Sequence, residues 1–194
     1  MKRTFATTAV LLSLLAGVPA MAQETKPQAP AAAPAAKPAF SAKSDILWQI
    51  RDAEKKLVQL AEATPAEKFG WRPSEGVRTT GEVFMHVAGA NYFFPTFWGG
   101  KIPDGMDPRG FEKMGGDKAK VVETLKASFA HVTKSIEELP DAELDKQIKL
   151  FGNDSTVRMA VLIVATHGHE HLGQSIAYAR MNGVTPPWSA QGGQ

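Results

Sequence analysis

Two histidines of the sequence are spaced so that both could bind one metal ion. His167 and His171 are four residues apart in a mostly apolar stretch, and Gln174 follows three residues after His171. On a helix, side chains at positions i and i+4 lie on the same face, so these two imidazoles could converge on a single ion. A buried imidazole also needs a polar partner for its nitrogens. A third imidazole would have to come from elsewhere in the chain.

The stretch from Thr156 to Gly183 has the periodicity of an amphipathic helix. Its inward positions recur every three or four residues, and the two histidines fall among them. These positions are Val157, Ala160, Val164, His167, His171, Gln174 and Tyr178. A β-strand would bring His167, His169 and His171 to one side instead, but the run is too long and too helical in its period. On the helix His169 points away from the core, so we expect it to be exposed.

His86 is the candidate for the third imidazole. Thr79-Thr80-Gly81-Glu82 is a capping-box pattern that opens another helix, and His86 lies on the predicted inward stripe of that helix. The other members of the stripe are Val83, Ala90, Phe93 and Phe97. His131 lies beside the stripe of a further helix, and we expect it to be a half-exposed surface residue. The predicted ligands are therefore His86, His167 and His171.

Three neutral imidazoles suit a divalent transition metal. Zinc, nickel, iron and manganese all accept imidazole nitrogen, and three protein ligands leave one position open for water or substrate. We expect zinc, with nickel, iron and manganese as alternatives. Gln174 lies one turn beyond His171 and could orient a ligand histidine or a bound water. A helix–helix hydrogen bond is an equally good explanation of Gln174, and no side chain stands out as a nucleophile.

The predicted fold is all-α, a four-helix bundle. A first helix should begin between Ser41 and Ser44 and run to about Ala63, and a third should begin after Asp117. The second helix should end near Phe94 or Trp98, where Pro95 interrupts it. Long connections, 99–116 and 140–155, join the second helix to the third and the third to the fourth. No alternation typical of a strand is present.

The N-terminal 22 residues have the pattern of a secretory signal peptide. Lys2 and Arg3 precede an apolar run that is too short to span a bilayer comfortably, and Ala20-Met21-Ala22 is a typical cleavage site. Residues 23–40 form a Pro/Ala-rich tether, 41–188 the bundle, and 189–194 a flexible tail. We therefore expect a periplasmic or secreted protein that has no stable membrane span after cleavage.

Composition argues against a nucleic-acid partner. Cleavage of the predicted signal peptide leaves equal numbers of basic and acidic residues, so the basic balance of the full chain comes from the leader. Nucleic-acid binding requires a clustered basic face. The chain has no cysteine, which excludes disulfides and thiolate ligands. We expect a small-molecule substrate or ligand, and the sequence is compatible with either a monomer or a homodimer.

Three motifs resemble the DinB-like family. Trp71-Arg72-Pro73 precedes His86, His167-x-x-x-His171 continues into Gly173-Gln174, and Tyr178-x-Arg180-x-x-Gly183-x-x-Pro186 follows. The similarity covers about Ser41 to Trp188. It implies a four-helix bundle of DinB-like connectivity with a three-histidine metal site at the three predicted ligands. Many members have a histidine at the position of Glu170. That position does not correspond to a metal ligand in the resemblance, so the predicted site is unaffected.

The resemblance leaves the reaction open. Relatives include thiol-cofactor-dependent transferases and isomerases, but thiol cofactors are mainly cytosolic, and export makes a thiol transferase less expected here. The first hypothesis is an exported metal-dependent enzyme, a hydrolase or a thiol-type transferase of unknown substrate. The alternatives are a non-catalytic bundle in which the metal is structural, and a metal-free bundle whose histidines have polar partners. The roles of Tyr178 and Arg180 are left open.

Overall fold

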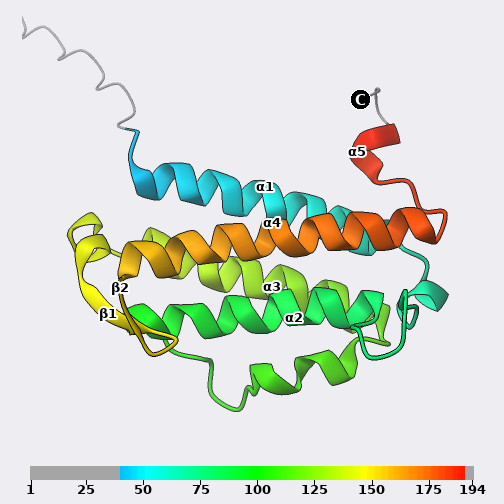
Figure 1. Cartoon of the computed structure of the whole chain (residues 1–194), viewed down its shortest axis with the longest axis horizontal. Coiled ribbons are helices and arrows are strands. Elements are labelled where there is room, and N and C mark those ends of the chain that lie inside the picture. Colours follow the sequence, from blue (N-terminus) through cyan, green and yellow to red (C-terminus); the bar gives the residue numbers. More distant parts are fainter. Residues whose placement is uncertain (1–39, 191–194) are drawn as a thin grey trace, which may run out of the picture. The chain divides into compact units, whose positions relative to one another are not determined.

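Four long helices make up most of the described chain (Figure 1). The computed structural model describes residues 40–190, so the predicted signal peptide, nearly all of the predicted tether and residues 191–194 lie outside it. The helices are α1 (Ala42–Ala63), α2 (Thr80–Phe93), α3 (Lys118–Glu137) and α4 (Val157–Met181). Side-chain oxygens cap their first turns, from Ser41, Thr79, Asp117 and Thr156 respectively. The all-α prediction is confirmed.

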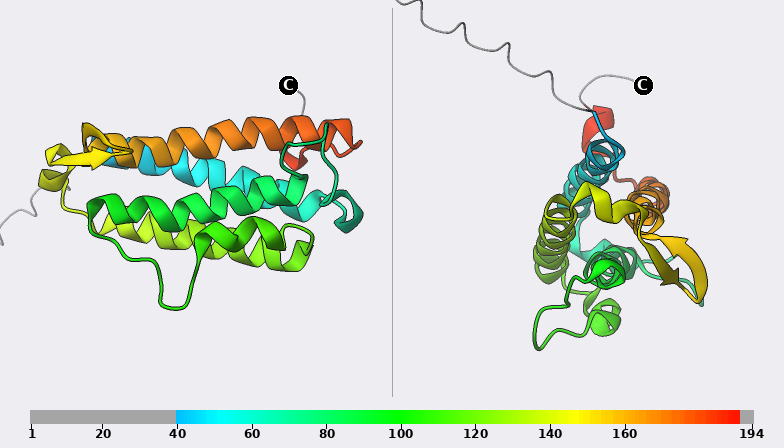
Figure 2. Two further views of the ribbon diagram at one scale, coloured as in Figure 1. Left: turned by 60° about the horizontal axis from the view of Figure 1, so that its bottom comes forward. Right: turned by 90° about the vertical axis from the view of Figure 1, so that its left-hand side faces the viewer.

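The helices pack in an order that differs from their order in the chain. α1 packs against α3 and α4, and α2 packs against the same two helices from the other side. α1 and α4 run in one direction, and α2 and α3 run in the opposite direction (Figure 1). The end-on view in Figure 2 shows the four helices around a common centre. Neighbouring α2 and α3 are therefore parallel, which requires the long connection between them to return along the bundle.

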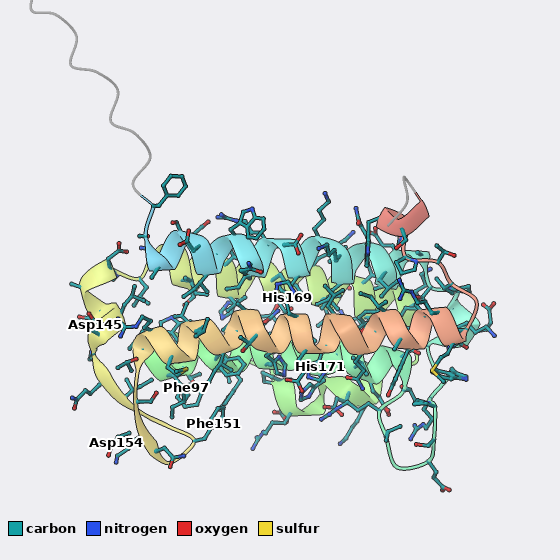
Figure 3. All side chains as sticks on the ribbon, turned by 45° about the horizontal axis from the view of Figure 1, so that its top comes forward. Phe97, Asp145, Phe151, Asp154, His169 and His171 are labelled. Carbon is teal, nitrogen blue, oxygen red and sulfur yellow. The ribbon has the colours of Figure 1, made fainter. Side chains whose placement is uncertain are left out.

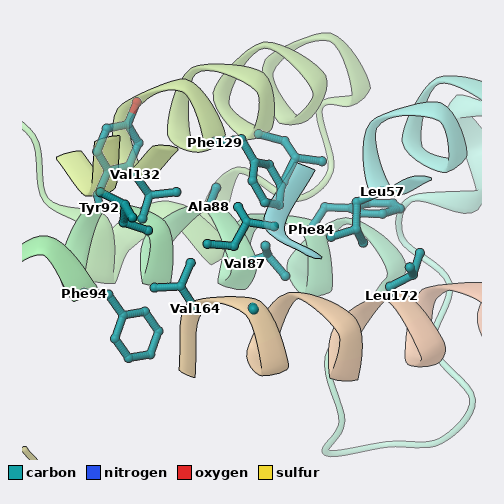
Figure 4. Close-up of a cluster of buried hydrophobic side chains, with 14 of the residues drawn as sticks. Leu57, Phe84, Val87, Ala88, Tyr92, Phe94, Phe129, Val132, Val164 and Leu172 are labelled. Carbon is teal, nitrogen blue, oxygen red and sulfur yellow. The ribbon is translucent and has the colours of Figure 1, made fainter. Parts of the chain in front are cut away.

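The interior of the bundle is a continuous apolar core. Its largest fully buried side chains include Leu57, Phe84 and Phe129, which come from α1, α2 and α3. Figure 4 shows these residues with Leu172 and Val164, which extend from α4 into the same cluster. Close packing of this kind fixes the rotation of each helix about its axis. It therefore determines which α2 and α4 side chains face one another.

The prediction of a narrow inward stripe on α2 was wrong at one position. Phe93 is 43% exposed, whereas Phe84, Met85 and Val87 are fully buried. α2 is covered by α3, by α4 and by part of the following connection, so most of its circumference is buried. Periodicity identifies one face only, and it cannot locate the exposed side of a helix that is covered on three sides. A 3-10 helix, η2 (Phe94–Trp98), continues directly from α2.

The connection between α2 and α3 contains a 3-10 helix that packs along α2. This helix, η3, spans Pro108–Met114. Gly81 allows the close approach, because a Cβ there would lie 1.7 Å from the carbonyl oxygen of Gly115. A Cβ on Gly89 would lie 2.9 Å from the carbonyl oxygen of Pro108. Two glycines of α2 therefore make room for the backbone at the two ends of η3.

The connection between α3 and α4 contains a small hairpin, so the prediction of no strands was wrong. After a 3-10 helix, η4 (Asp141–Asp145), β1 (Gln147–Leu150) pairs antiparallel with β2 (Asn153–Thr156). Each strand has only four residues, and β2 is composed of Asn, Asp, Ser and Thr. A strand this short and polar lacks the hydrophobic alternation by which strands are detected. The hairpin projects beside α4 at one end of the bundle (Figure 2).

The remaining elements are short. A 3-10 helix, η1 (Ala66–Lys68), follows α1. A helical turn, α5 (Pro187–Ala190), ends the described chain and extends two residues into the predicted tail. Among residues 40–190, no helix combines the length and apolar character needed to cross a membrane.

Candidate metal centre

The structure brings the three predicted ligand histidines together. One nitrogen each from His86, His167 and His171 can be chosen so that all three lie within 4.8 Å of one another. His86 Nε2 and His167 Nε2 are 3.2 Å apart, and the ring centroids of His167 and His171 are 4.5 Å apart. Figure 3 shows His171 on the side of α4 that faces α2. The i, i+4 spacing on α4 and the inward position on α2 produce this cluster, as predicted.

Gln174 fixes the orientation of His171. Its side-chain oxygen accepts a hydrogen bond from His171 Nδ1 at 2.8 Å, and its amide nitrogen donates to the hydroxyl of Tyr178 at 3.1 Å. The Tyr178 ring packs edge-on against Trp71. With a proton on Nδ1, the Nε2 lone pair of His171 is free to bind a metal. Gln174 therefore orients one of the predicted ligand histidines through a hydrogen bond within α4, and Tyr178 supports Gln174.

Glu112 orients His86 in the same way, and no pattern in the sequence predicted this contact. Its Oε1 lies 2.9 Å from His86 Nδ1 and 3.0 Å from Arg78 Nε. A proton on Nδ1 leaves the Nε2 lone pair directed toward the cluster. Glu112 comes from η3, in a connection that carries no periodic pattern, and it is 26 residues away from His86. No spacing rule links the two residues, so only the path of the connection reveals the contact.

Burial keeps the imidazoles in the form that binds metals. Desolvation, together with the smaller effects of the neighbouring His171, His86 and Arg78, lowers the pKa of His167 to about 3. Burial also lowers the pKa of His86, and so does the positive charge of Arg78, against the opposing hydrogen bond to Glu112. At neutral pH both rings are therefore neutral. A neutral ring with one nitrogen already protonated offers a single lone pair to a metal.

The other two histidines lie outside this cluster. His169 is half-buried where exposure was predicted, because its Nε2 lies 3.2 Å from the carbonyl oxygen of Gln49 on α1. Figure 3 shows it on the side of α4 opposite His171. His131 is half-buried, as expected, beside the ring of Tyr92. Glu170 is exposed, so it supports neither ring of the cluster.

The donor set fits a divalent transition metal. Three imidazoles from two helices present nitrogens within the span of one coordination sphere, and two of them are oriented by a hydrogen bond at the opposite nitrogen. Such a hydrogen bond is the usual companion of a metal-binding histidine. Three protein ligands are the set typical of catalytic rather than structural zinc sites.

A pocket of about 950 Å³ opens next to the cluster. His86, His167, Arg78 and Glu112 are among the residues that line it. Much of the remaining wall is apolar and comes from the end of α2, the connection 102–108 and the hairpin turn. Two of the three predicted ligand histidines therefore face a space large enough for a small organic molecule.

Comparisons with known proteins agree with the fold. A DinB-like protein from Bacillus cereus ATCC 10987 has a TM-score of 0.65 at 16% identity, covering 74% of this chain and 95% of that one. A DinB-like protein from Bacillus subtilis has a TM-score of 0.57 at 18% identity, covering 73% and 93%. YfiT from Bacillus subtilis is described as a probable metal-dependent hydrolase with an unusual four-helix bundle topology. It has a TM-score of 0.59 at 16% identity, covering 77% of this chain and 93% of that one. At these identities the likeness concerns the fold. No curated protein matches this chain.

Sequence comparison extends the agreement to the family. The model of the DinB superfamily matches residues 49–175, from the middle of α1 to the end of the histidine motif. This range contains all three clustered histidines and Gln174. Because the match covers more than half of the 194 residues, the chain belongs to the DinB superfamily.

Proposed function

We propose that this protein is an exported metal-dependent enzyme, a hydrolase or a transferase, that acts on a small molecule. The observation that carries the proposal is the position of His86 and His167, which belong to the histidine cluster and also line a pocket of about 950 Å³. A site that only held helices together would have no need of an adjoining cavity. The description of YfiT as a probable metal-dependent hydrolase supports the same reading.

The three histidines would hold the metal, with zinc as the first choice and nickel, iron or manganese as alternatives. A bound divalent ion supplies Lewis-acid catalysis and lowers the pKa of whatever occupies its open position. Glu112 and Gln174 accept hydrogen bonds from Nδ1–H of His86 and His171, which leaves the Nε2 lone pair of each ring free for the metal. Arg78 holds Glu112 in place through the contact at 3.0 Å. Export rests on the leader pattern of residues 1–22.

Elemental mass spectrometry on protein purified from the periplasm without a histidine tag tests the metal site. About one equivalent of a divalent transition metal is expected, and its absence, with no thermal stabilisation on adding zinc, would leave a metal-free bundle. N-terminal sequencing of the same material should begin at Gln23. An N-terminus at Met1 would overturn the export part of the proposal.

Treatment with a chelator distinguishes the proposed enzyme from a bundle in which the metal is structural. Because a continuous apolar core already packs the four helices together, we expect the metal-free protein to keep its helical circular dichroism. Loss of helical signal on treatment with a chelator would favour the structural alternative. A folded metal-free protein that regains one equivalent of zinc is then suitable material for hydrolase and thiol-transferase substrate screens.

A further inference from the structure

Phe151 occupies a backbone conformation that is unfavourable for its residue type. It is the first residue of the two-residue loop between β1 and β2, where Phe151 has φ +52° and Gly152 has φ +85°. Two-residue hairpin loops with both φ values positive favour Asn-Gly, Asp-Gly or Gly-Gly. In residues 40–190, Phe151 is the only residue other than glycine with a positive φ. A strained residue that the fold does not need is a candidate for a functional role.

The Phe151 side chain is not part of the apolar core. It is 62% exposed, and its ring meets Phe97 at 5.4 Å and Phe94 at 6.3 Å between centroids. Figure 3 shows Phe97 and Phe151 close together beside the hairpin. An exposed ring gains little from burial, so core packing does not account for the strained backbone that carries it.

Phe151 forms one wall of the pocket beside the histidines. Phe93 and Phe94 line the same pocket, and the ring of Phe94 packs edge-on against His167 at 5.8 Å. Phe93 is itself 43% exposed. A set of aromatic rings therefore extends from a predicted ligand histidine to the hairpin turn. Two of its three members are exposed to solvent, and a bound apolar group would cover them.

The charges around the pocket do not point to a highly charged substrate. Two cations and three carboxylates line it: Arg78, Arg109, Asp104, Asp107 and Glu112. Arg78 lies against Glu112, and Arg109 lies against Asp107 at 3.1 Å. Each cation is therefore paired with a carboxylate, and the carboxylates of the lining outnumber the cations, so the charge of the pocket does not favour a phosphate-like group.

We propose that the pocket binds a small molecule with a bulky apolar group seated against Phe93, Phe94 and Phe151 and a polar, metal-binding group at His86 and His167. This inference rests on the proposed function, since the polar group is the one presented to the metal. Phe151 then determines specificity. The hairpin accepts an unfavourable turn residue because that residue supplies an aromatic surface to the ligand.

Two hydroxamates that share a metal-binding group test the inference. Zinc-loaded protein is titrated by calorimetry with acetohydroxamate, which carries a methyl group, and with benzohydroxamate, which carries a phenyl group. We expect the phenyl compound to bind about tenfold more tightly or better, because additional apolar surface in a complementary pocket gains at least this factor. Equal affinities would overturn the inference.

Phe151→Asn distinguishes a binding role from a structural one. Asparagine is favoured in this turn, so we expect the melting temperature to stay unchanged or rise, while the preference for benzohydroxamate falls to about twofold or less and acetohydroxamate binds as before. A lower melting temperature together with weaker binding of both compounds would make Phe151 a structural residue. Trp48→Gln is the matched control, because Trp48 is 64% exposed on α1 and does not line this pocket.

The same titrations separate failure of this inference from failure of the proposed function. Zinc content is measured first. Absence of zinc, and of acetohydroxamate binding, would remove the metal site and with it the proposed function and this inference together. Stoichiometric zinc and measurable acetohydroxamate binding without a preference for phenyl would leave the metal site intact and reject only the apolar pocket.

Discussion

The two sides of the histidine cluster are built in different ways. On the α4 side, His167, His171 and Gln174 come from a single helix, and the hydrogen bond that orients His171 spans three residues. On the α2 side, His86 depends on Glu112, which is 26 residues away in η3. One side is held by the regular geometry of a helix. The other is held by the path of a connection, so the two sides should respond differently to mutation.

Alanine at any one of the three clustered histidines should have the largest effect on metal binding. Removal of a hydrogen-bond partner of a metal ligand typically costs about 10–100-fold in affinity, and loss of the ligand itself should exceed that. We expect His86→Ala, His167→Ala and His171→Ala each to be purified without stoichiometric metal. Elemental analysis of the three variants measures this.

The remaining histidines provide the controls. His131 and His169 lie outside the cluster, so His131→Ala and His169→Ala should keep one equivalent of metal. Full metal content in one of the three cluster variants would remove that residue from the ligand set.

Gly81→Ala should disrupt the α2 side while leaving α4 intact. The added methyl group would lie 1.7 Å from the carbonyl oxygen of Gly115, so η3 must move away from α2 and carry Glu112 with it. Forced overpacking of this kind costs about 1–3 kcal/mol or more in the free energy of unfolding. Urea unfolding measures the loss, and zinc affinity should fall with it.

Gly173→Ala is the matched change on the α4 side. Gly173 is exposed, and nothing lies within 4 Å of the position its Cβ would occupy. Alanine is favoured over glycine inside a helix by about 0.5–1 kcal/mol, so this variant should be as stable as the wild type or more so. Equal destabilisation by the two substitutions would contradict the distinction between the two sides.

Substitutions at the two supporting residues compare the sides directly. Glu112→Gln removes the charge on the His86 side, and Gln174→Ala removes the hydrogen bond on the His171 side. We expect each to weaken zinc binding by about 10–100-fold without loss of the fold. Competition with a chromophoric chelator measures both affinities. Glu170→Gln changes an exposed carboxylate next to His171, and it should leave zinc affinity unchanged.

The difference between the two sides also explains what could be predicted from the sequence. The four helices and the histidine cluster follow from capping residues such as Thr79 and from apolar spacing, which are local signals. Glu112 could not be predicted, because its contact depends on the path of the connection that carries η3. The exposure of Phe93 was missed for the same reason, since it depends on which elements cover α2. The hairpin was missed because its strands are short and polar.

The smallest predicted effect is a dependence of metal-free stability on pH. Burial holds the pKa of His167 at about 3, below its ordinary value of 6.5, so between these values the unfolded chain binds a proton that the folded chain excludes. Stability therefore falls as the pH decreases below about 6.5, by at most about 1.4 kcal/mol per pH unit for one such group. Urea unfolding of chelator-treated protein at pH 7.0 and 5.5 measures this slope in a range where few carboxylates titrate.

His167→Gln should make the dependence of stability on pH less steep, because glutamine does not titrate. The dependence should not vanish, because burial also lowers the pKa values of His86 and His131, which continue to contribute. Zinc should widen this difference. A bound ion stabilises the folded state and competes with protons for the imidazoles, so wild-type protein with zinc should lose more stability on acidification than His167→Gln with zinc, which we expect to bind the ion much more weakly. Identical slopes for wild type and variant without metal would mean that His167 takes up its proton in the folded state, and that burial does not keep this ring ready for a metal.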